Sequence, residues 1–258
     1  MLLRPKSGEK ATARAISLAD PKARAAFRRA LLTWYDANKR DLPWRKNQDP
    51  YRVWLSEIML QQTRVTAVIE KYNQFLKLFP NVEALAAAPQ ASVLAAWSGL
   101  GYYRRARALH DSARIILQDL GGQFPRTAEA WRELPGIGRY TSAAIASIAF
   151  GEKAALVDGN VERVVERLQG RRLPSPKIWQ LAESLLSPRR PGDFNQAMME
   201  LGATVCIPGE PKCLLCPVAK FCHTQGNLPG GAKSPKLSKV IVHYALDCSD
   251  GKVRLAQR

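Results

Sequence analysis

The spacing of apolar residues between residue 22 and about residue 205 constrains this chain most, because it is helical almost throughout. From Val65 the apolar side chains recur at intervals of three and four residues, which puts them on one face of a helix that Pro80 ends. Gly and Pro residues separate the other segments of this kind. We therefore expect an all-α core. The further helical patterns cover residues 24–37, 91–98, 104–119, 127–134, 139–150, 161–169, 177–186 and 194–203.

Composition points to a globular protein that binds a polyanion. The 258 residues are 46% hydrophobic, enough to bury the core of one large or two small domains. Lys and Arg number 39 against 22 Asp and Glu, a net charge of +17, which favours nucleic acid as the partner. An anionic membrane is the alternative, but no run approaches the roughly 18 apolar residues of a spanning helix, so we expect no membrane partner. Residues 1–21 fit a basic solvated tail better than a weak mitochondrial presequence.

Near the end of the chain, the spacing of apolar residues changes from the helical pattern to strict alternation. Residues 224–236 are rich in Gly, Pro, Ser and Lys and fit a linker. Apolar residues then alternate from Val240 to Leu246, Ser249 to Gly251 suit a turn, and a second alternating segment follows. A lone hairpin is marginal in water, so we expect residues 237–258 to be the truncated start of a β-containing domain.

Four of the five cysteines lie in CIPGEPKCLLCPVAKFC, residues 206–222, with the spacing C-x6-C-x2-C-x5-C. One cluster of four and a single distant cysteine do not make a secreted disulfide framework. Structural zinc sites more often use two separate short pairs, whereas one compact loop with four thiolates suits a [4Fe–4S] cluster. Spacing favours iron and sulfur and leaves zinc as the alternative.

Two glycine turns are candidates for DNA contact. In LPGIGRYT, Gly136 and Gly138 permit a tight turn, and a helix starting near Arg139 would present free N–H groups to a phosphate. An ordinary helix-helix turn is the alternative. In SGLGYYRRARAL, Tyr102 and Tyr103 precede Arg104, Arg105 and Arg107, which suits insertion into a base stack while the cations hold phosphates. Core packing for the tyrosines and a solvated face for the arginines are the other interpretation.

Two carboxylates have surroundings that favour opposite charge states. Glu57 lies in the apolar stretch VWLSEIML, where loss of water would raise its pKa and let it act as a general acid. Asp158 precedes Gly159 at the start of a helical pattern, where backbone donors would keep it ionised. A surface glutamate and a plain N-cap are the alternatives. Together the two fit cleavage of a glycosidic bond through a cationic sugar.

Over about residues 22–258 these segments, in this order, resemble the MutY-type adenine DNA glycosylases of the helix-hairpin-helix superfamily. The resemblance implies a two-lobed helical core, with residues 22–45 and 152–223 forming an iron–sulfur domain and residues 46–151 a six-helix domain. Residues 237–258 resemble the opening strands of a Nudix-like C-terminal domain. The segments that carry the resemblance are LPWR (42–45), SEIMLQQT (56–63), GLGYYRRA (99–106), LPGIGRYT (134–141), VDGNV (157–161) and the cysteine run.

The resemblance also implies an activity. Members of this family flip adenine, mispaired with 8-oxoguanine or guanine, out of double-stranded DNA and hydrolyse its N-glycosidic bond. Glu57 matches the family's catalytic acid, and Asp158 matches the aspartate that stabilises the sugar cation. The remaining matches are Tyr140 and Asn160 beside that step; Arg45, Leu60, Gln196 and Glu200 in the adenine pocket; Gln62 and Tyr102 wedged into the stack; and Cys206, Cys213, Cys216 and Cys222 on a [4Fe–4S] cluster.

Position 140 separates close relatives. The endonuclease III branch resembles this chain but carries, at the position of Tyr140, a lysine that forms a Schiff base and cuts the strand. We therefore expect a monofunctional enzyme. An endonuclease III-like enzyme for oxidised pyrimidines and a non-catalytic helix-hairpin-helix module are the alternatives. We also expect a monomer, a cytoplasmic, nucleoid-associated location in a bacterial source, and a weakened preference for 8-oxoguanine over guanine.

Overall fold

The computed structural model describes residues 15–228, 244–249 and 252–257, and most of these residues are helical. The predicted all-α core is confirmed, and the predicted helices match observed ones to within a few residues. Helix α2 was not among the predicted helical patterns, and the short helix α4 was missed, because six residues are too few for a clear periodic pattern. The helices are α1 (Pro21–Asn38), α2 (Pro50–Leu60), α3 (Val65–Leu78), α4 (Val82–Ala87), α5 (Gln90–Ala96), α6 (Arg104–Gln118), α7 (Ala128–Arg132), α8 (Arg139–Phe150), α9 (Gly159–Gln169), α10 (Ser175–Leu185) and α11 (Pro191–Thr204), with 3₁₀ turns η1 (Pro43–Arg45), η2 (Cys213–Leu215) and η3 (Ala219–Phe221).

Local sequence signals set the ends of several helices. Asp20 accepts from the backbone N–H groups of Lys22 and Ala23 at the start of α1. Asp49 does the same for Arg52 in α2, where proline occupies the first turn. Such caps satisfy donors that have no partner inside the helix. At the other end, α8 and α9 each stop at a glycine with left-handed backbone.

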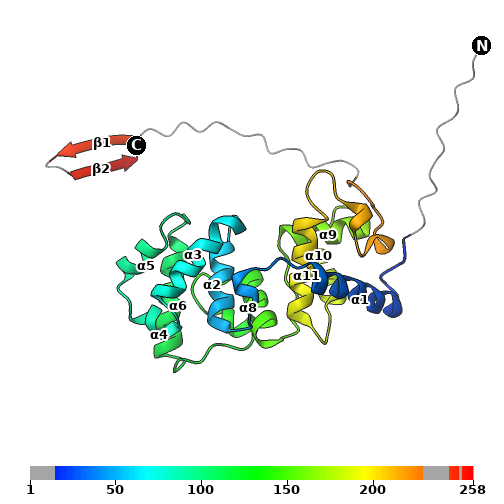
Figure 1. The fold of residues 1–258 in the computed structure, drawn as a ribbon, viewed down its shortest axis with the longest axis horizontal. Coiled ribbons are helices and arrows are strands. Elements are labelled where there is room, and N and C mark those ends of the chain that lie inside the picture. Colours follow the sequence, from blue (N-terminus) through cyan, green and yellow to red (C-terminus); the bar gives the residue numbers. More distant parts are fainter. Residues whose placement is uncertain (1–14, 229–243, 250–251, 258) are drawn as a thin grey trace, which may run out of the picture. The chain divides into compact units, whose positions relative to one another are not determined.

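Helix α8 joins the two sides of the helical core. It packs against α2 and α7 on one side and against α11 on the other, and α11 packs in turn against α1 and α9. In Figure 1, α2 to α6 gather on one side of α8, while α1 and α9 to α11 gather on the other. The eight buried residues of α8 include three alanines and two serines, small side chains that let neighbouring helices approach closely. Helix α8 therefore lies where residues from both sides of the core can meet.

Beyond Leu228 the chain forms a separate unit that contains an antiparallel hairpin. Strand β1 (Tyr244–Ser249) pairs with β2 (Lys252–Gln257), with Leu246 opposite Leu255. The predicted hairpin is confirmed for these residues, whereas Val240 and residues 229–236 of the predicted linker lie outside the described part. The Nudix-like assignment and the predicted domain boundaries stay predictions. None of the helices in the described part of the chain is long and apolar enough to cross a membrane.

Candidate active site

A pocket of about 250 Å³ lies where the two sides of the helical core meet. Its lining comes from η1, α2, α8, α9 and α11, segments far apart in the sequence. All four predicted catalytic residues and four of the six predicted substrate-binding residues line this one pocket. They are Arg45, Glu57, Leu60, Tyr140, Asp158, Asn160, Gln196 and Glu200.

Glu57 has a buried carboxyl group whose pKa lies near neutral pH. It lies on α2 and is 5% exposed, as its apolar neighbours in the sequence predict. Burial raises its pKa from 4.5 to about 7, and the charge of Asp158 adds to this shift. The hydroxyl of Tyr140 donates a hydrogen bond of 3.0 Å to Oε2 of Glu57 and opposes the shift, as does Arg45. At neutral pH a large share of Glu57 therefore carries a proton that it can give to a leaving group.

Asp158 lies at the N-cap of α9, as predicted. Its Oδ1 accepts from the backbone N–H groups of Asn160 and Val161 at 3.0 and 2.8 Å, and its Oδ2 accepts from Nδ2 of Asn160 at 2.8 Å. All three donors belong to the first turn of α9. The carboxylate is thus fixed by backbone and side chain while it still lines the pocket.

Close packing of α9 on α11 supports this arrangement. A Cβ on Gly202 would come within 2.6 Å of Cβ of Asn160, so only glycine lets α11 pass this close to the start of α9. Arg163, one turn after Asn160, donates to Oδ1 of Asn160 and to the backbone oxygens of Gly202 and Cys206. Asn160 is therefore held from two directions, and α9 connects the pocket to the cysteine loop.

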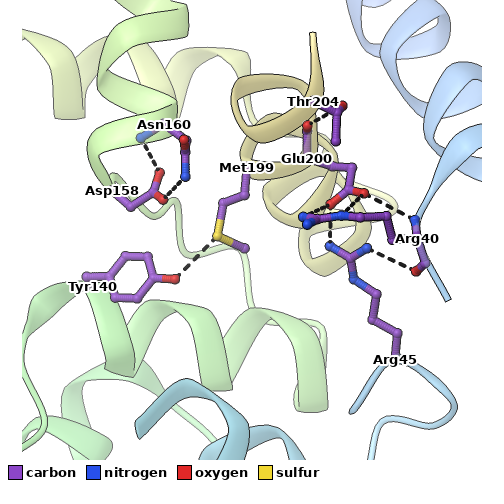
Figure 2. Close-up of polar contacts among 8 residues, drawn as sticks. All are labelled: Arg40, Arg45, Tyr140, Asp158, Asn160, Met199, Glu200 and Thr204. Atoms are coloured by element: carbon purple, nitrogen blue, oxygen red, sulfur yellow. Dashed lines mark hydrogen bonds and ion pairs between the residues drawn. The ribbon is translucent and has the colours of Figure 1, made fainter. Parts of the chain in front are cut away.

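Tyr140 lies between Glu57 and α11. Besides its bond to Glu57, its hydroxyl lies 3.3 Å from Sδ of Met199. Figure 2 shows Tyr140, Met199 and Asp158 next to one another on one side of the pocket and the arginines with Glu200 on the other. Burial raises the pKa of Tyr140 well above its usual value, with Glu57 adding to the effect, so this side chain stays a neutral donor.

Glu200 is the second buried glutamate in the pocket, and two arginines hold it (Figure 2). Arg40 binds both of its carboxylate oxygens, at 2.7 and 2.8 Å, and also donates its backbone N–H. Arg45 donates to Oε2 at 2.9 Å and lies over the ring of Tyr35. Burial alone would raise the pKa of Glu200, but these hydrogen bonds and charges lower it to about 2. Glu200 is therefore an ionised group that orients Arg45.

The two remaining predicted substrate contacts, Gln62 and Tyr102, lie outside the pocket. Both side chains are exposed, Tyr102 to 54%, and each has left-handed backbone, with φ of 56° and 46°. Gln62 lies between α2 and α3, and Tyr102 lies between α5 and α6. The structure thus separates residues that line the pocket from residues that project from loops.

The predicted glycine turn is formed before α8. Gly136 has a φ of 75°, and a Cβ there would come within 2.7 Å of Ala108. Gly138 is the N-cap of α8, with no side chain capping the first turn, and both glycines and Arg139 are exposed. Arg139 lies over the ring of Trp179, 3.7 Å from its centroid, and pairs with Glu183 on α10. Both glycines of this turn are thus accessible, while the side chain of Arg139 is already engaged.

The four cysteines of residues 206–222 line a second pocket, together with Arg167. All four are free thiols, and Arg167 donates to Sγ of Cys206 at 3.3 Å. No three His, Cys, Asp or Glu side chains in the described residues are arranged to hold a single metal ion. Four convergent thiols with an N–H donor on one sulfur are a donor set that fits a thiolate-bound iron–sulfur cluster.

Two residues at these sites were missed or misjudged from the sequence. Nothing in the sequence indicated a role for Arg40, because its partner Glu200 lies 160 residues away. Arg105 was grouped with Arg104 and Arg107 as a surface cation that holds phosphates or faces solvent. That prediction was wrong for Arg105, which is 7% exposed, because its guanidinium binds backbone oxygens at the end of α2 and in the loop before α6. Arg104 and Arg107 are exposed.

Comparisons with known proteins give the family of this chain. The family model "HhH-GPD superfamily base excision DNA repair protein" matches residues 55–187. The adenine DNA glycosylase of Rattus norvegicus is 48% identical over 84% of this chain and 46% of the rat protein. That of Homo sapiens is 49% identical over 78% of this chain and 39% of the human protein. The chain thus spans less than half the length of these curated relatives.

Solved structures show the same fold. A thermostable thymine-DNA glycosylase is 35% identical, with a TM-score of 0.73, over 79% of this chain and 97% of that chain. A non-covalent endonuclease III-DNA complex is 21% identical, with a TM-score of 0.65, over 78% and 96%, which supports the fold alone. The family model covers half of the chain and includes Glu57, Tyr140 and Asp158. This chain belongs to the HhH-GPD superfamily of base excision DNA repair proteins.

Proposed function

We propose that this chain is a monofunctional adenine DNA glycosylase that removes adenine mispaired with 8-oxoguanine or guanine. The observation that carries the proposal is the pairing of Glu57 and Asp158 on one pocket. Glu57 is about half protonated near pH 7, and Asp158 accepts three hydrogen bonds as a carboxylate. The curated relatives named above, at 48 and 49% identity, are adenine DNA glycosylases and supply the substrate class.

The two carboxyl groups divide the chemistry between them. As the N-glycosidic bond breaks, the base leaves with the bonding electrons and takes the proton of Glu57. The sugar is left with a positive charge, which the fixed carboxylate of Asp158 stabilises without having to reorient. Water then adds to the sugar carbon and gives its proton back to the carboxylate of Glu57. Tyr140 and Asn160 keep the two carboxyl groups in place through the hydrogen bonds described above.

The other lining residues suit a planar base. Arg45 is held by Glu200 and Gln196 lies on the same helix as Glu200, so both can offer polar contacts to the edge of a flipped adenine. Leu60 lines the pocket as an apolar contact for the face of the base. The described lining residues include no lysine, and Tyr140 cannot form a Schiff base. Strand cleavage is therefore not expected.

DNA engagement follows from the exposed loops and the charge of +17. The turn of Gly136 and Gly138 offers backbone N–H groups to a phosphate, and Gln62 with Tyr102 can enter the stack from which adenine leaves. The flipping cost is smallest at a mispair, which contributes to selectivity. Arg139 would have to leave Glu183 to reach a phosphate, so its role is secondary to the backbone. The monomeric state and the location in the cell remain predictions.

Cys206, Cys213, Cys216 and Cys222 would hold a [4Fe–4S] cluster, as predicted from their spacing. When bound, this group would supply a rigid crosslink for residues 206–222 rather than redox chemistry for base removal. Lys212 and Lys220 lie in the same segment and can present positive charge to DNA. Iron and sulfide content of the purified protein tests the assignment, and zinc bound in their place would overturn it.

Base release from defined duplexes tests the function. Single-turnover reactions on duplexes containing A:8-oxoguanine, A:G, T:G and oxidised pyrimidines are resolved on gels before and after alkali. We expect product from the two adenine mispairs, visible as a broken strand only after alkali. The T:G arm is needed because a solved relative at 35% identity is a thymine-DNA glycosylase. Release of thymine or an oxidised pyrimidine instead of adenine, nicking without alkali, or binding without release would each contradict the proposal.

A further inference from the structure

Arg105 makes an unusual set of contacts for an arginine on a DNA-binding protein. It lies in the first turn of α6 and is 7% exposed, and no carboxylate contacts its guanidinium in the described residues. All six of its hydrogen-bond acceptors are oxygen atoms of two segments, the end of α2 with the loop that follows it and the loop before α6. Nη1 donates to the backbone oxygens of Ile58, Met59 and Gln61, and Nη2 donates to Oγ1 of Thr63 and the backbone oxygens of Leu100 and Gly101.

The first group of acceptors closes the end of α2. The last carbonyl groups of a helix have no partner within it, and a cation at this end also favours the helix dipole. Arg105 satisfies Ile58 and Met59, the two residues after Glu57, and continues to Gln61 and Thr63 on either side of Gln62. The loop that presents Gln62 is therefore tied down at both its ends.

The second group of acceptors closes the loop before α6. Leu100 and Gly101 immediately precede Tyr102, and the guanidinium lies over the rings of Trp97 and Tyr102, at 5.5 and 5.4 Å. The indole Nε1 of Trp97 donates to the backbone oxygen of Gly101 at 3.1 Å. One buried cation thus links the loop of Gln62 to the loop of Tyr102.

These two loops carry exposed side chains on strained backbone. Gln62 and Tyr102 are two of the three non-glycine residues with positive φ among the described residues. Such backbone is strained for a residue with a side chain and persists only where the surroundings impose it. Arg105 supplies that constraint to both loops at once, through a planar group with donors in a fixed geometry.

We infer that Arg105 is a positioning residue that presents Gln62 and Tyr102 to DNA as one rigid pair. This inference rests on the proposed function, because the pair acts by filling the stack that the flipped base leaves. A rigid pair loses little freedom on entering DNA, whereas two independently mobile loops would have to be ordered at that moment. Arg105 does not itself line the pocket and reaches its lining only through Thr63, so its substitution acts on flipping before chemistry.

The test compares Arg105→Lys with Arg114→Lys, an exposed arginine further along α6. Lysine keeps the charge but gathers its donors at one point, so it cannot serve both loops. Each protein is saturated with a duplex that holds 2-aminopurine, a fluorescent adenine analogue, opposite 8-oxoguanine. Unstacking of the analogue raises its fluorescence emission. We expect this increase to be roughly tenfold smaller with Arg105→Lys than with wild type, and to be the same with Arg114→Lys as with wild type.

Trp97→Phe is a milder second variant if Arg105→Lys does not fold. It removes the indole N–H that donates to the backbone oxygen of Gly101, together with part of a buried ring, and keeps an aromatic ring beside the guanidinium, so we expect a smaller loss of emission in the same direction. Equal emission from Arg105→Lys, Trp97→Phe and wild type would overturn the inference. Failure of the proposed function would give another result. The wild type would then release no adenine, while the difference in 2-aminopurine emission between wild type and Arg105→Lys would still show whether Arg105 positions the two loops.

Discussion

Glu57 and Glu200 are buried glutamates that line the same pocket, yet their pKa values differ by several pH units. Burial raises the pKa of Glu57 to about 7, whereas the arginines around Glu200 lower its pKa to about 2. Glu200 receives three side-chain hydrogen bonds from Arg40 and Arg45, while Glu57 receives one, from the neutral hydroxyl of Tyr140. Depth of burial therefore does not decide the charge of a carboxyl group here. The charged donors that accompany it decide it.

The difference assigns a separate task to each glutamate. A group that is half protonated near pH 7 can give up a proton during a reaction. A carboxylate locked by two guanidinium groups cannot, but it can hold those groups in place. We therefore expect changes at Glu57 to affect chemistry and changes at Glu200 to affect stability first.

Glu57→Gln should have the largest effect on rate. The amide keeps the size of the side chain but has no acidic proton, so adenine release should fall by about 10²- to 10⁴-fold. Affinity for the mispaired duplex should change little, as measured by fluorescence anisotropy. Glu70→Gln, at an exposed position on α3, is the matched control and should keep full activity. A variant at position 57 that still turns over at the wild-type rate would show that another group supplies the proton.

The Glu200→Gln variant should be less stable than the wild type. A carboxyl whose pKa falls from 4.5 to about 2 stabilises the folded state by about 3 kcal/mol above pH 5. In the wild type this contribution is lost as pH falls from about 4.5 toward 2, because the group becomes protonated in the unfolded chain first. Urea unfolding at pH 7 should therefore show a loss of about 3 kcal/mol for the variant. Glu183→Gln, which breaks the exposed pair with Arg139, should cost less than about 1 kcal/mol.

Asp158→Asn should separate catalysis from helix capping. Asparagine caps helices about as well as aspartate, so thermal unfolding should change by only a few tenths of a kcal/mol. The rate should fall by roughly 10²-fold, because the negative charge that faces the sugar is gone. A rate loss that is matched by an equal loss of stability would instead mean that Asp158 is only a cap.

Tyr140→Phe should have the smallest effect and should move a pH profile rather than abolish activity. The hydroxyl of Tyr140 donates to Glu57 and holds its pKa below the value that burial alone would produce. Removing it should raise the pKa of Glu57 and shift the alkaline fall in single-turnover rate to higher pH. A shift to lower pH would show that the hydrogen bond favours the protonated form of Glu57.

The sequence was informative where chemistry is local. Helix boundaries follow from apolar spacing, Asp158 from its place before a helix, and the apolar setting of Glu57 from its neighbours on α2. It was uninformative where function depends on contacts between distant segments. Arg40 and Glu200 meet across 160 residues, and Arg105 differs from Arg104 only by the face of α6 that it occupies. Such pairs need the packing of the whole helical core before they become visible.

The most direct test of this division of labour is the pH dependence of adenine release by the wild-type protein. Single-turnover rates on an A:8-oxoguanine duplex should be measured between about pH 5 and 9 at constant ionic strength. If Glu57 donates the proton, the rate should fall above a midpoint near pH 7, approaching tenfold per pH unit at the alkaline end. A rate that stays constant or rises through this range would contradict the assignment of Glu57 as the acid.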